Sequence, residues 1–153
     1  MRLLLPALLL LAGCAASAPS TLQTDPDSMR EIIATEHAPA ALGPYSQAVR
    51  VGNALYCAGQ LGLDPATGQL AEGGIEAETR QALDNLRAVV EAAGFTMADA
   101  VQVQVFLADL NDYQAMNAVY TTYFDESKPA RAAFEVARLP RDARVEIMLT
   151  AAK

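Results

Sequence analysis

The spacing of hydrophobic residues along the chain predicts two helices. From residue 75 onwards, apolar residues recur every three or four positions along one stripe, and polar residues fill most of the remaining positions. This spacing predicts a helix over 75–93, which Gly94 ends because glycine readily adopts the positive φ found after a helix C-terminus. The second predicted helix covers 112–124, where larger residues step along one face: Tyr113, Met116, Tyr120 and Phe124.

Alternation of apolar and more polar residues predicts the strands. Over 101–107, three valines and a leucine alternate mainly with glutamines, which is the period-two pattern of a half-buried strand. The same alternation runs over 144–151. Gly52-Asn53 separates two apolar runs and indicates a hairpin, and residues 64–68 carry the proline and glycine of a tight turn. The other extended segments are expected at 32–34, 48–51, 54–58 and 131–137.

These elements occur in the order β-β-β-α-β-α-β-β, which predicts an α+β domain with two helices on one face of a sheet. The other face of the sheet would carry no helix. Its composition is mixed, since Gln102, Gln104 and Phe106 share it on one strand. On another strand Glu146 and Met148 share it. A face that is neither clearly polar nor fully apolar suits burial against other subunits, so an oligomer is expected.

Composition and charge exclude several classes of protein. The 153 residues are enough for one domain, and 52% hydrophobic with 19% charged residues is typical of a globular chain. A net charge of −7 disfavours nucleic acid as a partner, because phosphate binding requires a basic surface. One histidine and two distant cysteines show neither zinc-ligand spacing nor a disulfide framework. Cys57, in a predicted strand, is expected to be buried and inert.

The first 29 residues do not have the pattern of a folded domain. Arg2 precedes a ten-residue apolar run over 3–12, which is too short to span a bilayer. The run leads into Leu11-Ala12-Gly13-Cys14, which resembles a bacterial lipobox. The resemblance implies that 1–13 are a lipoprotein signal peptide and that Cys14 is lipidated. Residues 14–29 would then be a flexible tether to a domain over 30–153.

A lipobox implies export to the periplasmic side of the bacterial envelope. Because Ala15 follows Cys14 where aspartate would mark retention at the inner membrane, the signal points to an outer-membrane lipoprotein. The protein would then contact the membrane only through its lipid. Two alternatives stay open: a secretory signal with an incidental cysteine, and translation from Met29, which would leave the protein in the cytosol.

Several segments together closely resemble the RidA/YjgF family of reactive-intermediate deaminases. They are 34–48 (ATEHAPAALGPYSQA), 58–62 (AGQLG) ahead of 64–68, 81–86 (QALDNL), and 129–140 (PARAAFEVARLP) running into Val145-Glu146-Ile147. The resemblance implies a chorismate-mutase-like fold and a homotrimer with clefts between adjacent subunits. It also implies hydrolysis of 2-imino acids, and of the enamines in equilibrium with them, to 2-keto acids and ammonia. The family needs no metal or organic cofactor.

The resemblance assigns roles to six residues of the domain. Arg131 matches the arginine that binds the substrate carboxylate, a task that suits a planar, two-pronged guanidinium. Glu146 matches the carboxylate that orients water and passes protons. These two are the predicted catalytic residues. Four further residues match positions that line or support the substrate cleft: Tyr45, Gly59, Asn117 and Ala133.

The chain also departs from the family pattern. Ala58 stands where many relatives carry serine, and Ala132-Ala133 where many carry serine and cysteine; Met148 replaces a frequent glutamate. A contact made through the backbone N–H of residue 133 would survive this change, whereas a side-chain contact would not. These departures keep an alternative open, in which the same cleft binds a small carboxylate without turning it over.

Overall fold

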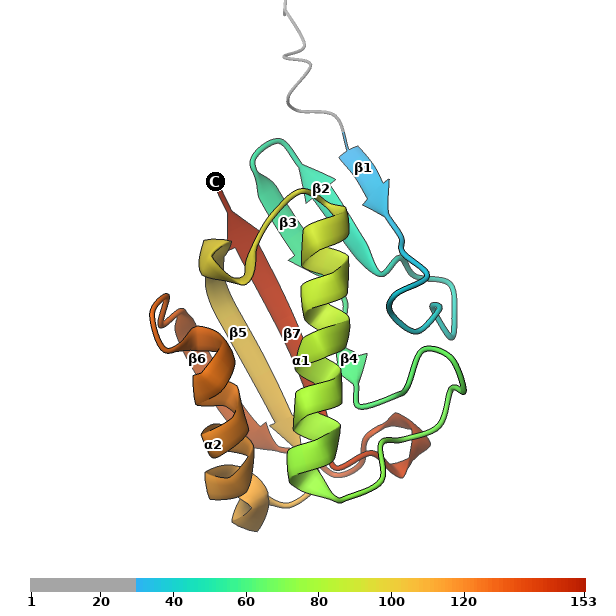
Figure 1. Ribbon diagram of the computed structural model, residues 1–153, viewed down its shortest axis with the longest axis vertical. Coiled ribbons are helices and arrows are strands. Elements are labelled where there is room, and N and C mark those ends of the chain that lie inside the picture. The colour runs from blue at the N-terminus through green and yellow to red at the C-terminus, as the bar shows by residue number, and fades with distance from the viewer. Residues whose placement is uncertain (1–29) are drawn as a thin grey trace, which may run out of the picture.

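The structure of the protein is a computed structural model that describes residues 30–153, so the expectations for 1–29, including Cys14 and Met29, lie outside the described residues. One sheet contains strands in the order β1-β2-β3-β7-β5-β6, and β4 pairs with β7 (Figure 1). The strands are β1 (Arg30–Ile33), β2 (Ala48–Val51), β3 (Ala54–Cys57), β4 (Gln60–Leu61), β5 (Ala100–Leu107), β6 (Ala130–Glu135) and β7 (Val145–Ala152). The α-helices are α1 (Ile75–Ala92) and α2 (Tyr113–Phe124), and short 3-10 helices cover Met97–Asp99, Leu110–Asp112 and Pro140–Asp142.

Both α-helices cover the same face of the sheet, with α1 across its middle and α2 beside it near β6 (Figure 1). The alternation predicted for the last strand is confirmed, because every second residue of β7 is buried: Val145, Ile147, Leu149 and Ala151. They pack in one core with the apolar stripe of α1. The α+β architecture with two helices on one sheet face is therefore confirmed. Within residues 30–153, no helix has the length and hydrophobicity needed to cross a membrane.

Gly94 ends α1 as predicted. Its φ is 77°, in the region that favours glycine. The N–H of Gly94 donates to the carbonyl of Glu91 at 2.9 Å, and the N–H of Phe95 donates to the carbonyl of Val90 at 3.0 Å. This is the Schellman arrangement, which satisfies two carbonyls that the helix itself leaves without partners.

The predicted hairpin and turn are also confirmed. Val51 pairs with Ala54 across the two-residue turn, in which Gly52 has a φ of 58°. At the start of the 64–68 turn, the Asp64 carboxylate accepts hydrogen bonds from the backbone N–H groups of Ala66, at 2.7 Å, and Thr67, at 3.1 Å. Both turns form from local sequence chemistry that needs no distant partner.

Val101 is the first correction, because the alternation predicts it on the buried face and its side chain is 47% exposed. Ala100 and Gln102 pair with the consecutive residues Ala151 and Thr150 of β7, so Val101 is the extra residue of a β-bulge. Ala100 takes the buried position instead. The bulge depends on how two strands pair. It therefore cannot be predicted from the alternation of apolar and polar residues within one strand.

The predicted element order omits the two-residue strand β4, and the segment predicted as a strand over 131–137 ends at Glu135. β4 is too short to show a period. It exists because Gln60 and Leu61 lie against Ile147 and Glu146 of β7. The remaining order agrees with the prediction.

The face of the sheet opposite the helices carries an uncovered apolar surface within the described residues. Tyr56 and Phe134 are each 53% exposed there, and half-buried Phe106 stacks on Phe134 with the ring centres 6.5 Å apart. Isolated exposed apolar residues are common in folded proteins, whereas several on one open sheet face are less usual.

Gly62 holds the segment after β4 close to α1. A Cβ built on Gly62 would lie 2.5 Å from the Cα and 2.6 Å from the carbonyl oxygen of Glu78, both backbone atoms that cannot easily move. We therefore expect Gly62→Ala to lower the free energy of unfolding by about 1–3 kcal/mol. Urea unfolding at matched protein concentration measures this change. Gly43→Ala is the control, because its Cβ would make only ordinary contacts at 3.5 Å or more. Equal unfolding curves for the two variants would contradict the close packing.

Candidate active site

Arg131 lies on β6 and turns toward α2. In the parallel pairing of β5 and β6 it lies opposite Val103, which is buried beneath the helices. Its Nη1 donates to Oδ1 of Asn117 at 2.7 Å, and its Nη2 donates to the hydroxyl of Tyr113 at 2.8 Å. The guanidinium carbon lies 4.5 Å from the centre of the Tyr120 ring. The structure thus brings together Arg131 and Asn117, two of the residues that the sequence singled out.

One surface hollow contains Arg131 itself, and a second contains its hydrogen-bond partner Tyr113. One, of about 370 Å³, is lined by Arg131 and Asn117 together with residues of α2 and of the segment that leads into β6. The other, of about 500 Å³, includes Tyr113 and Ala133. Ala133 is two residues beyond Arg131 on the same strand and so points to the same face. Since β6 is an edge strand, a ligand between Arg131 and Ala133 could also reach backbone groups.

Glu146 lies on β7 on the other face of the sheet. It pairs with Phe106 of β5, which is three positions from Val103 and therefore points away from the helices. Burial raises the pKa of the Glu146 carboxyl above its ordinary value. Among residues 30–153, no side chain makes an ion pair with this carboxylate. A carboxyl group in this setting gives up its proton less readily than one in water.

Gly59 packs directly against Glu146. A Cβ on Gly59 would collide with Oε1 of Glu146, so only glycine leaves room for the carboxylate in this position. The requirement is steric, since Gly59 is not among the glycines with positive φ. One carboxylate oxygen of Glu146 therefore occupies the space that a side chain at position 59 would fill.

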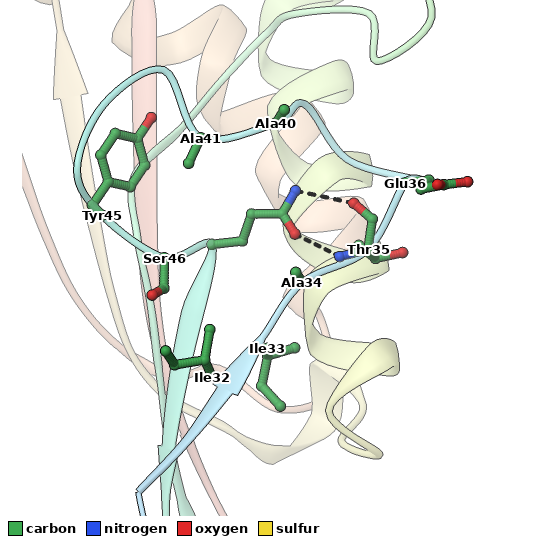
Figure 2. Close-up of a pocket in the computed structure, with 10 residues that line it drawn as sticks. Ile32, Ile33, Ala34, Thr35, Glu36, Ala40, Ala41, Tyr45 and Ser46 are labelled. Atoms are coloured by element: carbon green, nitrogen blue, oxygen red, sulfur yellow. Dashed lines mark hydrogen bonds between the residues drawn. The ribbon is translucent and has the colours of Figure 1, made fainter.

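Tyr45 lies in the loop between β1 and β2, and it is 49% exposed. Its hydroxyl accepts a hydrogen bond from the N–H of Leu42 at 3.1 Å. Tyr45 lines a pocket of about 430 Å³. Figure 2 shows the residues around this pocket, among them Ile32 and Ile33 of β1. Buried Gln47 anchors this loop through hydrogen bonds to the backbone of residues 35–39, including one of 2.8 Å to the carbonyl of Pro39. Tyr45 also shares a small hollow with Gly59.

The candidate residues therefore form two groups within one chain. We call Arg131, Asn117 and Ala133 the arginine half-site, and Glu146, Gly59 and Tyr45 the glutamate half-site. Their central residues, Arg131 and Glu146, point to opposite faces of the sheet. Within one chain, the sheet therefore lies between these two side chains.

Sequence reasoning missed two kinds of residue near these groups. Tyr113 and Tyr120 read as core positions of a helix face, yet both contact the Arg131 guanidinium. Asn85 is buried in α1 and donates to the carbonyls of Leu61 (3.1 Å) and Leu63 (2.8 Å), which secures the chain around β4. The available signal was an amide on an otherwise apolar helix stripe, because a buried amide requires hydrogen-bond partners.

Two other kinds of reactive group were considered in the sequence, the thiol of Cys57 and clusters of metal ligands. Cys57 is buried as predicted, and burial raises the pKa of its thiol to about 12, so the thiolate is scarce at neutral pH. Across residues 30–153, no three histidine, cysteine or acidic side chains are grouped closely enough to bind a metal ion.

Comparison with known sequences finds relatives over most of this domain. The pattern of the family described as Endoribonuclease L-PSP matches residues 35–153. A RutC family protein of Pyrococcus horikoshii is 52% identical over 125 residues, which cover 82% of this chain and 99% of that protein. The 2-iminobutanoate/2-iminopropanoate deaminase of Mus musculus is 53% identical over 119 residues, covering 78% of this chain and 88% of the mouse protein.

Solved structures share the fold at comparable similarity. The YjgF gene product of E. coli superimposes with a TM-score of 0.76 and 46% identity, covering 80% of this chain and 98% of that one. E. coli TdcF, solved with bound serine, gives a TM-score of 0.77 and 39% identity over 80% of this chain and 98% of its own. The chain belongs to the RidA/YjgF family, whose sequence pattern is the one described as Endoribonuclease L-PSP.

Proposed function

We propose that this protein hydrolyses 2-imino acids, and the enamines in equilibrium with them, to 2-keto acids and ammonia. The observation that carries the proposal is the setting of Arg131. Neutral oxygens of Asn117 and Tyr113 hold its guanidinium, and no carboxylate among residues 30–153 pairs with it. Its full positive charge and three of its five N–H donors are therefore available to a substrate carboxylate. The name of the mouse relative supports this substrate class.

The proposed reaction adds one water molecule across the C=N bond. Glu146 accepts a proton from the attacking water, whose oxygen bonds to the imine carbon. The same proton then passes to the nitrogen, which gives a tetrahedral amino alcohol at that carbon. A second proton, released by the new hydroxyl group, passes to the nitrogen, so that the C–N bond breaks and ammonia leaves as the carbon–oxygen double bond forms. A carboxyl group whose pKa is raised by burial suits both halves of this proton transfer, because it must first take up and then release the proton. Gly59 provides the space in which the carboxylate can approach the substrate.

We also propose that the active cleft forms between two copies of the chain in a homotrimer. The arginine half-site of one subunit would face the glutamate half-site of the next, with Tyr45 entering from the side of Glu146. Two observations support this arrangement: the half-sites point to opposite faces of the sheet, and the helix-free face exposes apolar residues such as Tyr56 and Phe134. Burying that face would account for its composition.

The family's description names a second activity, that of an endoribonuclease. A net charge of −7 disfavours the polyanionic backbone of RNA, so we do not propose a ribonuclease activity for this chain. The bound serine in E. coli TdcF supports one alternative, in which the cleft binds a small amino or keto acid without turnover. Ala133, without a reactive side chain, is compatible with both functions.

For the location of the protein, we propose export and lipidation at Cys14, with the domain on the periplasmic side of the envelope. The support is the apolar run and the lipobox-like sequence at 11–14. Metabolic labelling with a fatty acid should label the full-length chain and leave Cys14→Ala unlabelled. Equal labelling of both proteins, or of neither, would contradict lipidation at this cysteine.

The function is tested with the full-length chain and 2-iminobutanoate or 2-iminopropanoate, generated in the assay by an amino-acid oxidase. Semicarbazide traps the imine that remains. A deaminase lowers the yield of semicarbazone and releases ammonia faster than buffer does. If a correctly assembled sample matches buffer, the enzyme proposal fails for these substrates. Calorimetric binding of serine or 2-oxobutanoate would then favour the binding alternative.

A further inference from the structure

Three side chains of α2 hold the guanidinium of Arg131 from one side. Tyr113, Asn117 and Tyr120 are spaced by four and three residues, so they lie along one stripe of the helix. The ring of Tyr120 lies 4.5 Å from the guanidinium carbon, and the ring of Tyr113 lies 5.6 Å from it. The faces of the two rings stabilise the positive charge of the guanidinium, whereas the two hydrogen bonds define the orientation of its plane.

The two hydrogen bonds act on different nitrogens. Nη1 donates to Asn117 at 2.7 Å and Nη2 donates to the hydroxyl of Tyr113 at 2.8 Å. With only one acceptor, the planar group could pivot about that single bond. With two acceptors on separate nitrogens, its rotation within the plane is determined. Bidentate binding of a carboxylate depends on this rotation, because both oxygens must meet N–H groups at once.

The two acceptors are also uncharged, which affects how Arg131 can bind a ligand. An acidic residue at either position would hold Arg131 in place but would neutralise it. A tyrosine hydroxyl and an amide oxygen orient the guanidinium and leave its charge for a ligand. Tyr113 also lines the hollow that includes Ala133, so it borders the arginine half-site on two sides: through its bond to Arg131 and through this hollow.

We propose that the hydroxyl of Tyr113 is a positioning group, which sets the rotation of the Arg131 guanidinium for bidentate capture of the substrate carboxylate. This inference rests on the proposed function for its substrate class. Its structural part, the orientation of Arg131 by Tyr113, can be tested without any substrate.

The test compares full-length Tyr113→Phe with a matched change on the same helix. Tyr123→Phe also removes one hydroxyl from α2 and one short hydrogen bond, the 2.7 Å bond to Asp84, but it leaves Arg131 untouched. We expect Tyr113→Phe to raise KM for 2-iminobutanoate about tenfold, with kcat within about twofold of the wild type. Tyr123→Phe should keep both constants, although both variants lose a similar increment of thermal stability.

Nitrogen-15 NMR of the arginine side chains supplies the substrate-free readout. Arg131 is assigned by the signals that disappear in Arg131→Lys. In the wild type we expect its Nη protons to be resolved, because two hydrogen bonds slow rotation about the bonds from Cζ to the Nη atoms. In Tyr113→Phe these signals should merge or broaden, and in Tyr123→Phe they should not change.

The outcomes separate the inference from the proposed function. An inactive wild type that binds no keto acid would refute the proposed function, and the NMR comparison would still decide whether Tyr113 orients Arg131. An active wild type with unchanged KM in Tyr113→Phe would overturn the positioning role. So would Arg131 signals identical in the wild type and in Tyr113→Phe.

Discussion

Arg131→Ala is expected to lower kcat/KM for 2-iminobutanoate by at least about a hundredfold, because it removes the only charge of the arginine half-site that can pair with the substrate carboxylate. Without the guanidinium, the carboxylate of the substrate would lose its hydration on entering the cleft and gain no ionic partner. The measurement is the initial rate of ammonia release against substrate concentration. Thermal unfolding of the same sample checks that the fold is retained.

Two further variants sharpen the result. Arg131→Lys keeps the charge but loses the planar pair of donors, so its kcat/KM should fall between those of the wild type and Arg131→Ala. Arg87→Ala is the matched control, since Arg87 also donates a 2.8 Å hydrogen bond and lies 5.7 Å from a tyrosine ring centre, but on the exposed side of α1. Full activity in Arg131→Ala, or equal losses in the alanine variants of Arg131 and Arg87, would refute the assigned role.

Glu146→Gln is the second change with a large expected effect. Glutamine has nearly the same shape and fits beside Gly59, but it cannot take a proton from water. We expect kcat to fall by about 10²–10⁴-fold with little change in KM, the usual scale for loss of a general base. A rise in KM without loss of kcat would contradict the role in proton transfer and would indicate that Glu146 only shapes the cleft.

The pH dependence gives an independent test of Glu146. Its carboxylate is the active form in the first step, and burial raises the pKa of this group. Activity should therefore be lost as the pH falls through that raised pKa, at higher pH than for an ordinary glutamate. In Glu146→Gln this acid limb should disappear from the residual activity. The acid limb should persist in Glu91→Gln, which changes an exposed glutamate of α1.

Mixing the two inactive variants tests where the cleft forms. If each cleft combines Arg131 of one subunit with Glu146 of another, random mixed trimers of Arg131→Ala and Glu146→Gln should restore about a quarter of the wild-type activity. In such trimers, about one cleft in four receives both intact residues. Mixed samples that stay as inactive as their parents would contradict a shared cleft, since each chain would then have to supply both residues itself.

Much of the fold could be predicted from the sequence because it follows from neighbours along the chain. The period of apolar residues defined α1 and the buried side of β7, and glycine chemistry ended the helix at Gly94. A helix or strand period is visible within one segment, since it reflects which side chains lie on one face of that segment alone. The roles predicted for Arg131 and Glu146 had another source, the resemblance of the segments around them to the RidA/YjgF family.

Relations between segments were decided only by the tertiary structure. β4 exists through its pairing with β7, and Val101 is exposed because a bulge in β5 shifts the register. The opposite orientations of Arg131 and Glu146 depend on where two strands pair with β5, and no single segment contains that information. Tyr113 illustrates the same limit: its position on the apolar stripe of α2 followed from the sequence, whereas its hydrogen bond to Arg131 required β6 to lie beside that helix. Local periodicity thus determined the elements, and long-range register determined which residues could act together.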